Sequence, residues 1–319
     1  MKADTRSFYQ NAVQRAVSWI VEHLDDALDL GSLARDAALS PFHFHRVFRG
    51  MVGETPLELQ RRLRLERAAA RLLEGDDAVT GVAFEAGYET HESFTRAFRA
   101  AYGLAPSAYR HQARLPRHGC LRIQTELAAP SGIHFGFEAA SRPFVPISRG
   151  ESTMNVTIRD MPELRLATVR HVGAYQRISE AFQRLGAIAG PAGLFRRPNA
   201  ADAAAVPTGM GVAVYHDDPD TTSEPELRSD AGVVVGNDAV LPAGVVELRL
   251  GAGRYATMTH VGPYSALGDA WGRLMGEWLP KSGERVGGGL AYEVYRNDPM
   301  HVSESELRTE LYVPLLPSS

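Results

Sequence analysis

The chain has 319 residues, of which 44% are hydrophobic and 23% are charged, and its formal net charge is −4 at pH 7. This length and apolar content favour two folded domains. No apolar run approaches the roughly 20 residues of a membrane-spanning helix, and the N-terminus shows no signal peptide, so we expect a cytoplasmic protein without a membrane partner. The single cysteine excludes an internal disulfide and a thiolate metal cluster.

Charge is unevenly distributed along the chain. Residues 1–115 carry 15 basic and 15 acidic side chains, yet the stretch 40–72 holds seven arginines against three glutamates. Such a local basic patch indicates an anionic partner, of which nucleic acid is the main candidate.

Residues 8–110 are predicted to be helical throughout, because their apolar residues recur at helical spacing. The stretch 32–52 predicts a short helix, a tight turn, and a second helix with Ser40 as N-cap and Pro41 at its first position. This order is typical of a helix-turn-helix. The pattern recurs 50 residues later, and the matched pairs are Phe44 with Phe94, Arg46 with Arg96, Phe48 with Phe98, and Arg49 with Arg99.

The second helix of each pair is expected to bury its phenylalanines and to turn its polar residues outward. Arginine can bond guanine edges in the major groove, and threonine and histidine can reach bases or phosphates. A merely solvated face is the alternative, but two matched copies favour DNA. The helix between them, 56–73, would hold the two readers in a fixed relation, roughly 34 Å or one DNA turn apart. The candidate DNA-binding residues are His43, His45, Arg46, Arg49, His91, Glu92, Thr95, Arg96 and Arg99.

Three stretches carry a resemblance to a known family: "SPFHFHRVF" at 40–48, "LELQRRLRLERAAARLL" at 57–73, and "VAFEAGYETHESFTRAFRAAYGLAPSAYR" at 82–110. Residues 8–110 resemble the DNA-binding domain of the AraC/XylS transcription regulators, in the Rob, MarA and SoxS branch. The resemblance implies double-stranded DNA as partner, with RNA polymerase as a further candidate. It places base-facing positions at Phe42, His45, Arg46, His91, Glu92, Thr95 and Arg96. That branch often has Trp and Gln where this chain has Phe42 and His45, so its target sequence does not transfer.

Residues 113–154 lose helical periodicity and contain several prolines, which indicates a linker. We therefore expect a DNA-binding domain at 1–112, a linker at 113–154, and a second domain at 155–319. His134, inside the linker, is interpreted as structural.

The back of the chain contains a second duplication. Residues 167–190 and 256–279 agree in nine of 24 positions, and both contain a His-Val-Gly-x-Tyr stretch. Two later stretches, beginning at 213 and 226, recur 80 residues further on. Each copy predicts a strand, a helix and two strands joined by an Asp-Pro turn, a β-α-β-β unit. The expected fold is α+β, with two pseudo-symmetric repeats and a ligand cleft where they meet.

The copies differ at informative positions. Phe182 and Ala213 of the first copy correspond to Trp271 and Glu293 of the second. A glutamate beside tyrosines and near a tryptophan suits a cavity for an apolar, cationic molecule, because a buried carboxylate needs a partner. A glutamate on a solvated sheet face is the alternative reading of the strand alone.

Residues 155–316 resemble the GyrI-like effector-binding domain through "HVGPYSALGDAWGRLMGEWLPKSG", "GGLAYEVYRNDP" and "ELRTELYVPL". The resemblance implies a multidrug-sensing type of site, with the cavity glutamate at Glu293. It implies an aromatic wall at Trp271, Trp278, Tyr292 and Tyr295, and Tyr264 and Phe182 complete the candidate ligand-binding residues.

The two resemblances together predict a transcription regulator controlled by a small-molecule effector, lipophilic or cationic in its candidate class, and not an enzyme. No metal site and no cofactor are expected. The alternative is a fusion whose GyrI-like domain hydrolyses a small molecule, with Glu293 as general base and Tyr264 or Tyr295 as acid. A DNA-repair methyltransferase fused to such a domain is excluded, because it would need several cysteines.

Overall fold

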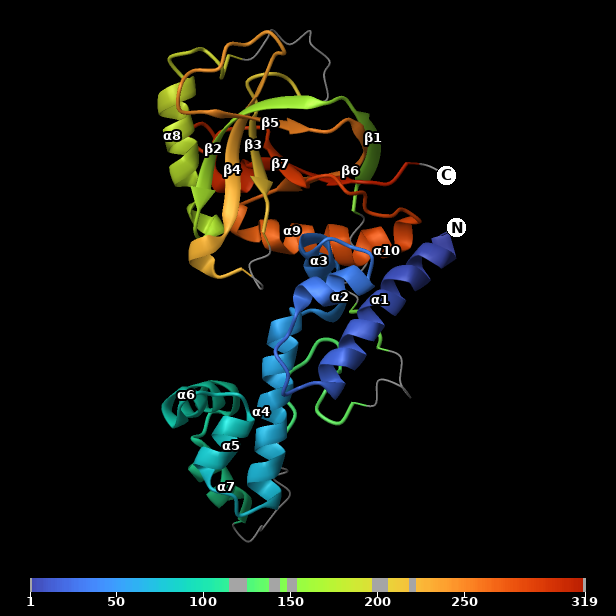
Figure 1. Ribbon diagram of the computed structural model, residues 1–319, viewed down its shortest axis with the longest axis vertical. Coiled ribbons are helices and arrows are strands. Elements are labelled where there is room, and N and C mark those ends of the chain that lie inside the picture. The colour runs from blue at the N-terminus through green and yellow to red at the C-terminus, as the bar shows by residue number, and fades with distance from the viewer. Residues whose placement is uncertain are drawn as a thin grey trace. The chain divides into compact units, whose positions relative to one another are not determined.

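The computed structural model describes residues 2–114, 125–137, 144–147, 154–196, 206–217 and 222–317 (Figure 1). The chain divides into two compact units. We call residues 1–9, 31–50 and 148–319 the sheet unit, and residues 10–30 and 51–147 the helix unit. The domain boundaries expected at 112 and 154 stay predictions.

The helix unit is built from a long helix, α4, and the short helices α5, α6 and α7, together with most of α1. Its core includes the side chains of Leu72, Val82, Phe94, Phe98 and Tyr109, all of them buried. The elements are α1 (Lys2–Glu22), α4 (Pro56–Glu74), α5 (Val79–Glu85), α6 (His91–Tyr102) and α7 (Pro106–Arg114).

Local sequence signals set the ends of these helices. Thr55 forms a capping box at the start of α4: its hydroxyl accepts the backbone N–H of Glu58 at 3.1 Å, and the Glu58 carboxylate accepts the N–H of Thr55 at 2.8 Å. Thr90 caps α6 through its hydroxyl, which accepts the backbone N–H of Ser93. Helix α6 ends at Gly103, whose φ of 76° is the left-handed conformation that glycine adopts without strain.

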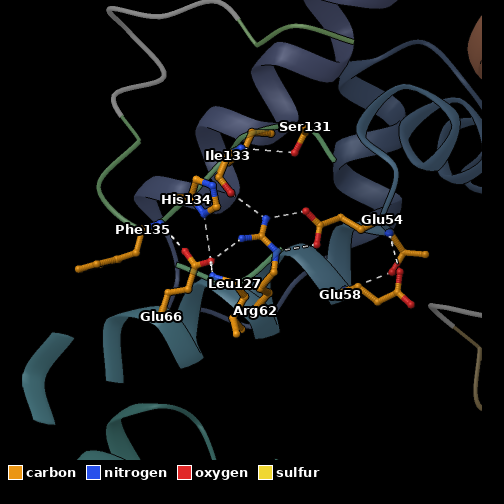
Figure 2. A network of polar contacts seen from close by, with 10 residues as sticks. Glu54, Glu58, Arg62, Glu66, Leu127, Ser131, Ile133, His134 and Phe135 are labelled. Carbon is orange, nitrogen blue, oxygen red and sulfur yellow. Dashed lines mark hydrogen bonds and ion pairs between the residues drawn. The ribbon is translucent and has the colours of Figure 1, made fainter. Parts of the chain in front are cut away.

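A buried carboxylate holds part of the predicted linker against α4 (Figure 2). Glu66, which is 1% exposed, accepts the backbone N–H groups of Leu127 at 2.9 Å and Phe135 at 2.8 Å. Arg62 donates to the same carboxylate at 2.9 Å, and His134 Nδ1 lies 3.1 Å from it. Residues 125–137 are therefore anchored to the helix unit by hydrogen bonds that no periodicity in their sequence reveals, and His134 has the structural position expected of it.

The sheet unit is organised around an antiparallel sheet (Figure 1). Among the described residues this sheet has eight strands, in the order β1-β6-β8-β7-β3-β4-β2-β5. This confirms the predicted α+β class. The strands are β1 (Val156–Met161), β2 (Leu164–Val172), β3 (Gly211–Tyr215), β4 (Arg228–Val235), β5 (Val246–Leu250), β6 (Gly253–Val261), β7 (Tyr292–Tyr295) and β8 (Arg308–Pro314). The unit's helices are α2 (Leu30–Asp36), α3 (Pro41–Val52, in the unit to Gly50), α8 (Ser179–Ala189), α9 (Leu267–Arg273) and α10 (Leu279–Ser282). A π-helical turn, Leu274–Trp278, joins α9 to α10.

The two repeats are β2-α8-β3-β4 and β6-α9-β7-β8, as the duplicated sequences predict. The structure adds one strand before each of them. Strand β1, ahead of the first repeat, pairs with β6 of the second, and β5, ahead of the second, pairs with β2 of the first. The predicted β-α-β-β repeats are therefore confirmed, and the two added strands, which the sequence interpretation did not include, lie at the sheet's edges. The Asp-Pro turn expected at 218–219 lies outside the described residues.

The repeated His-Val-Gly-x-Tyr stretch forms the same turn in both copies. Gly173 and Gly262 have φ values of 124° and 132°, which side-chain-bearing residues rarely adopt. His171 Nε2 lies 2.9 Å from the carbonyl oxygen of Ala174, and His260 bonds the corresponding carbonyl of its own turn. The geometry of this turn thus explains why the His-Val-Gly-x-Tyr motif occurs in both copies.

Candidate functional site

Helix α6 presents a polar face opposite its buried phenylalanines. Phe94 and Phe98 are fully buried, with ring centroids 5.4 Å apart. Their helical neighbours on the other side, His91, Glu92, Arg96 and Arg99, are exposed, and Thr95 is partly exposed. The arrangement provides arginine and histidine side chains on one outward face, which suits the reading of a major groove, whereas the hydroxyl oxygen of Thr95 is itself buried.

Helix α3 departs from this pattern. Phe44 and Phe48 are buried and Arg49 is exposed, as predicted. His43 and His45, expected to turn outward, are instead only 4% and 5% exposed. The expectation was wrong for these two because α3 packs within the sheet unit on more than its phenylalanine stripe.

The environment of His43 keeps its imidazole neutral. Its Nδ1 lies 3.0 Å from the hydroxyl of Ser40, while its Nε2 meets no hydrogen-bond partner among the described residues. Burial and the nearby charge of Arg46 lower the pKa of His43 to about 3. In this arrangement the side chain supplies no positive charge for a phosphate.

The predicted basic patch is largely neutralised along α4. Three of its arginines form ion pairs inside the helix unit, which leaves fewer free cations than the count of arginines indicates. The pairs are Arg62 with Glu54 and Glu66, Arg67 with Asp25, and Arg71 with Asp77 and Glu85.

The central pair of strands brings the two repeats together. Strands β3 and β7 are antiparallel neighbours, and Ala213 pairs directly with Glu293. These two positions are also equivalent in the duplicated sequences, 80 residues apart. Positions that are equivalent and also pair with each other lie at the pseudo-two-fold axis, so this axis carries one carboxylate where strict symmetry would place two.

Glu293 is 2% exposed and is held by three donors. Its Oε1 accepts Nε1–H of Trp271 at 2.7 Å, and its Oε2 accepts the hydroxyls of Tyr295 at 2.9 Å and Tyr215 at 3.1 Å. All three donors are uncharged groups. The alternative of a solvated glutamate is wrong, and a buried carboxylate with neutral donors favours a cation as its further partner.

Aromatic rings surround the carboxylate with the symmetry of the duplication. Tyr175 packs edge-on against Tyr215 with centroids 4.9 Å apart, and the equivalent pair, Tyr264 and Tyr295, is 5.3 Å apart. Phe182 adds a further edge contact with Tyr295 at 5.4 Å. Phe182, Trp271, Tyr264 and Tyr295 are therefore brought together as expected.

Two expected wall residues lie elsewhere. Tyr292 stacks on Tyr312, with centroids 4.6 Å apart, in the core that includes Val294. Successive strand residues point to opposite faces, so the neighbour of Glu293 in β7 cannot share its face. Trp278 ends the π-helical turn, partly exposed, seven residues beyond Trp271, and it is not among the donors to Glu293.

Tyr215 and Tyr175 were missed by the sequence interpretation. The signal was present, because Tyr215 corresponds to Tyr295 and Tyr175 to Tyr264 in the duplicated stretches. Once Glu293 is placed at the pseudo-two-fold axis, both copies of each tyrosine must approach it.

Burial, followed by the charge of Glu293, raises the pKa of Tyr215 and of Tyr295 well above the ordinary tyrosine value. Both hydroxyls therefore stay protonated and keep donating to the carboxylate. A general acid works best with a pKa near the working pH, so these shifts disfavour proton transfer by Tyr295.

A cavity of about 520 Å³ opens next to Tyr215, on the side of the N-terminus of α3. This volume is typical of sites for drug-sized molecules. Its lining includes Ser40, Phe42, His43, Tyr215, His216 and Ala291.

Within the described part of the chain, no helix is long and apolar enough to cross a membrane. The same residues contain no group of three or more His, Cys, Asp or Glu side chains suited to a metal ion.

Comparison with known proteins divides the chain in the same way as its motifs. Residues 154–316 match the GyrI-like small molecule binding domain family, and residues 33–112 match a helix-turn-helix domain family. The regulatory protein SoxS of Salmonella typhimurium is 32% identical over 104 residues, which are 33% of this chain and 97% of SoxS. The HTH-type transcriptional regulator YbfP of Bacillus subtilis is 37% identical over 103 residues, or 32% of this chain and 35% of YbfP.

The match thus spans only about a third of the length of YbfP. Among solved structures, the EcmrR–DNA complex aligns with a TM-score of 0.42 and 19% identity, over 51% of this chain and 58% of that one. The GyrI-like match by itself covers just over half of the chain, and both resemblances drawn from the motifs are confirmed. The chain carries an AraC-type helix-turn-helix region ahead of its second domain. It is a DNA-binding transcription regulator that belongs to the GyrI-like small-molecule-binding family.

Proposed function

We propose that this regulator is controlled by a small, apolar, positively charged effector that binds beside Glu293. The observation that carries the proposal is the buried carboxylate at the pseudo-two-fold axis, held by three neutral donors and surrounded by aromatic rings. A cation among aromatic faces gains from their quadrupoles, and the carboxylate adds a full opposite charge in a site shielded from water. Because Ala213 stands opposite Glu293, the site favours a single positive charge.

The DNA-facing side of the proposal is supported by α6. The positions of α6 that we propose for reading double-stranded DNA are the exposed His91, Glu92, Arg96 and Arg99 and the partly exposed Thr95, together with Phe42, Arg46 and Arg49 of α3. RNA polymerase is a further candidate partner, as expected of a transcription regulator.

The test uses tetraphenylphosphonium, a permanent aromatic cation, and triphenylphosphine oxide, a neutral molecule of similar shape. Their affinities for the full-length protein and for Glu293→Gln would be measured by calorimetric titration. We expect the cation to bind the unsubstituted protein about tenfold more tightly than it binds Glu293→Gln. This ratio corresponds to a difference in binding free energy of about 1.4 kcal/mol. The neutral molecule should not distinguish the two proteins. Equal affinity of the cation for both would remove Glu293 from the site.

Hydrolysis, the alternative function, is not favoured by this geometry. Of the two candidate acids, Tyr295 donates its hydroxyl to Glu293, and burial raises the pKa of Tyr295 and of Tyr264 above the ordinary tyrosine value, so neither is suited to protonate a leaving group. Turnover of an ester panel by the full-length protein, abolished in Glu293→Gln, would reverse this conclusion.

A further inference from the structure

One face of α3 is packed against the helix that carries Trp271. Phe42, Arg46 and Gly50 follow one another at intervals of four residues, so they lie on the same face of α3. Within the sheet unit this face meets Trp271 and the residues after it. We call this the α3 contact, formed by Phe42, Arg46 and Gly50 on one side and Trp271, Gly272 and Gly276 on the other.

Arg46 lies between two aromatic rings in the α3 contact. Its guanidinium carbon is 4.4 Å from the ring centroid of Phe42 and 4.1 Å from that of Trp271. The two rings are themselves edge-on, with centroids 6.5 Å apart. A cation thus already occupies the face of the tryptophan whose N–H binds Glu293.

The backbones of the two helices touch at glycines. A Cβ atom added to Gly50 would lie 2.5 Å from both Gly272 O and Gly276 Cα, and one added to Gly276 would lie 2.2 Å from Gly50 Cα. These distances are far shorter than any ordinary carbon contact and involve backbone atoms, which cannot rotate away. Only glycine permits so close a crossing, as in other helix pairs that pack through small residues.

The duplications provide an internal comparison for these glycines. The counterpart of Gly50 in the second helix-turn-helix is Ala100, and the counterparts of Gly272 and Gly276 in the first repeat are Gln183 and Ala187. Neither counterpart helix has glycine at these positions. The glycines therefore accompany the α3 contact itself and are not a general feature of the repeats.

The α3 contact excludes the use of the same face for DNA. Phe42 and Arg46 are the positions that face bases in the proposed function, and both are here turned to Trp271. A guanidinium held between two rings cannot simultaneously bond a guanine edge. The α3 contact and major-groove binding by α3 are alternative states.

We infer that Arg46 acts as an internal ligand of the effector site, so that a cationic effector and the α3 contact compete for the ring face of Trp271, whose N–H binds Glu293. Binding of the effector displaces Arg46, opens the α3 contact and releases α3 for DNA. This inference rests on the proposed effector site and adds to it the means by which effector binding reaches the DNA-binding helix. The effector class it assigns is a cation that is flat or aromatic enough to replace a guanidinium on a tryptophan.

The test uses two variants that open the α3 contact without altering Glu293. Gly276→Ala introduces the clash with Gly50, and Arg46→Ala removes the internal ligand. Gly268→Ala is the matched control, because a Cβ at Gly268, on α9 just before the π-helical turn that contains Gly276, meets nothing within 4 Å. A contact closed nine-tenths of the time lowers the apparent affinity of a competitor about tenfold. We therefore expect Gly276→Ala and Arg46→Ala to bind tetraphenylphosphonium about tenfold more tightly than the unsubstituted protein, and Gly268→Ala to match it.

Hydrogen exchange of the α3 amides, followed by mass spectrometry on the same full-length proteins, gives a readout independent of the effector. Exchange should be faster in Gly276→Ala and Arg46→Ala than in Gly268→Ala. Unchanged cation affinity in both opening variants, with Glu293→Gln still weakening the cation, would overturn the α3 contact while leaving the effector site intact. Absence of cation binding in every protein would overturn the effector site. Hydrogen exchange of the α3 amides would then decide by itself whether the α3 contact protects α3.

Discussion

Trp271 differs from Phe182, its counterpart in the first repeat, by one hydrogen-bond donor, and that donor reaches Glu293 at 2.7 Å. Replacing Trp271 with Phe keeps an aromatic ring and leaves one buried carboxylate oxygen without this partner. An unsatisfied buried acceptor costs about 1–3 kcal/mol. We expect Trp271→Phe to lower the free energy of unfolding of the sheet unit by that amount, measured by urea unfolding followed by circular dichroism.

The control for this loss is a double-mutant cycle with Glu293→Gln. Because the amide is uncharged, Trp271→Phe should cost less in the Glu293→Gln background than in the natural one. An identical cost in both backgrounds would mean that the indole contributes packing alone.

His43 makes the sheet unit sensitive to acid. Burial, with the charge of Arg46, lowers its pKa from 6.5 to about 3 in the folded chain. Below pH 6.5 the unfolded chain takes up a proton that the folded chain does not, so stability falls as pH falls from 6.5 toward 3 and is unaffected above 6.5. Linkage gives a loss of about 2 kcal/mol from this residue between pH 7 and pH 5.

The measurement is urea unfolding at both pH values for the unsubstituted protein and for His43→Gln. The substitution should remove about 2 kcal/mol of the difference between pH 7 and pH 5. His91→Gln, which replaces an exposed histidine on α6, serves as the comparison. If His43→Gln retained the full pH dependence, the acid sensitivity would belong to other groups.

At the scale of elements, α6 is the helix whose predicted reading face is open. Arg96→Ala should cost roughly 1–3 kcal/mol in affinity for a duplex selected by the protein from a random library, if Arg96 bonds a base edge. Arg61→Ala, which removes one exposed positive charge from α4, controls for general electrostatic attraction. Fluorescence anisotropy at one fixed salt concentration would compare them, and equal losses would assign Arg96 to phosphates.

Helix α4 depends on Glu66, which joins it to residues 125–137. Glu66→Ala would leave Arg62 and two backbone N–H groups without their shared acceptor (Figure 2). Arg62 keeps its ion pair with Glu54, so the cost comes mainly from the backbone N–H groups that lose their acceptor, about 1–3 kcal/mol. We expect faster hydrogen exchange at the amides of Leu127 and Phe135 and a loss of this size in helix-unit stability.

Glu74→Ala, an exposed glutamate at the end of the same helix, is the matched control and should change neither quantity. Unaltered protection of Leu127 and Phe135 in Glu66→Ala would show that residues 125–137 are held by other contacts.

For the whole molecule, periodicity and duplication were sufficient to predict the helical region at residues 8–110 and the α+β domain that follows it. They also predicted that only one of the two repeats carries the glutamate, Glu293. They could not predict the burial of His43 and His45, because helical spacing identifies the stripe that faces one core and α3 is buried on a second face. Strand β5 was overlooked although its apolar residues Val246, Leu248 and Leu250 alternate with charged ones, and what local alternation cannot show is that β1 and β5 each pair with the opposite repeat. Tyr292 was misplaced because it was assigned from the resemblance, whereas strand alternation puts the neighbour of Glu293 on the opposite face of the sheet.

Effector binding and DNA binding are coupled if both depend on the α3 contact, and thermodynamic linkage makes this coupling reciprocal. If the cation opens the α3 contact, it raises the affinity of the protein for DNA by some factor, and DNA must raise the affinity for the cation by the same factor. A contact closed nine-tenths of the time limits this factor to about ten. Titrating tetraphenylphosphonium with and without the selected duplex, and the duplex with and without the cation, would measure both sides of the cycle. In Gly276→Ala both factors should fall toward one, because the contact is already open, whereas Gly268→Ala should keep them. Strong coupling that persisted unchanged in Gly276→Ala would mean that the two sites communicate by a route other than α3.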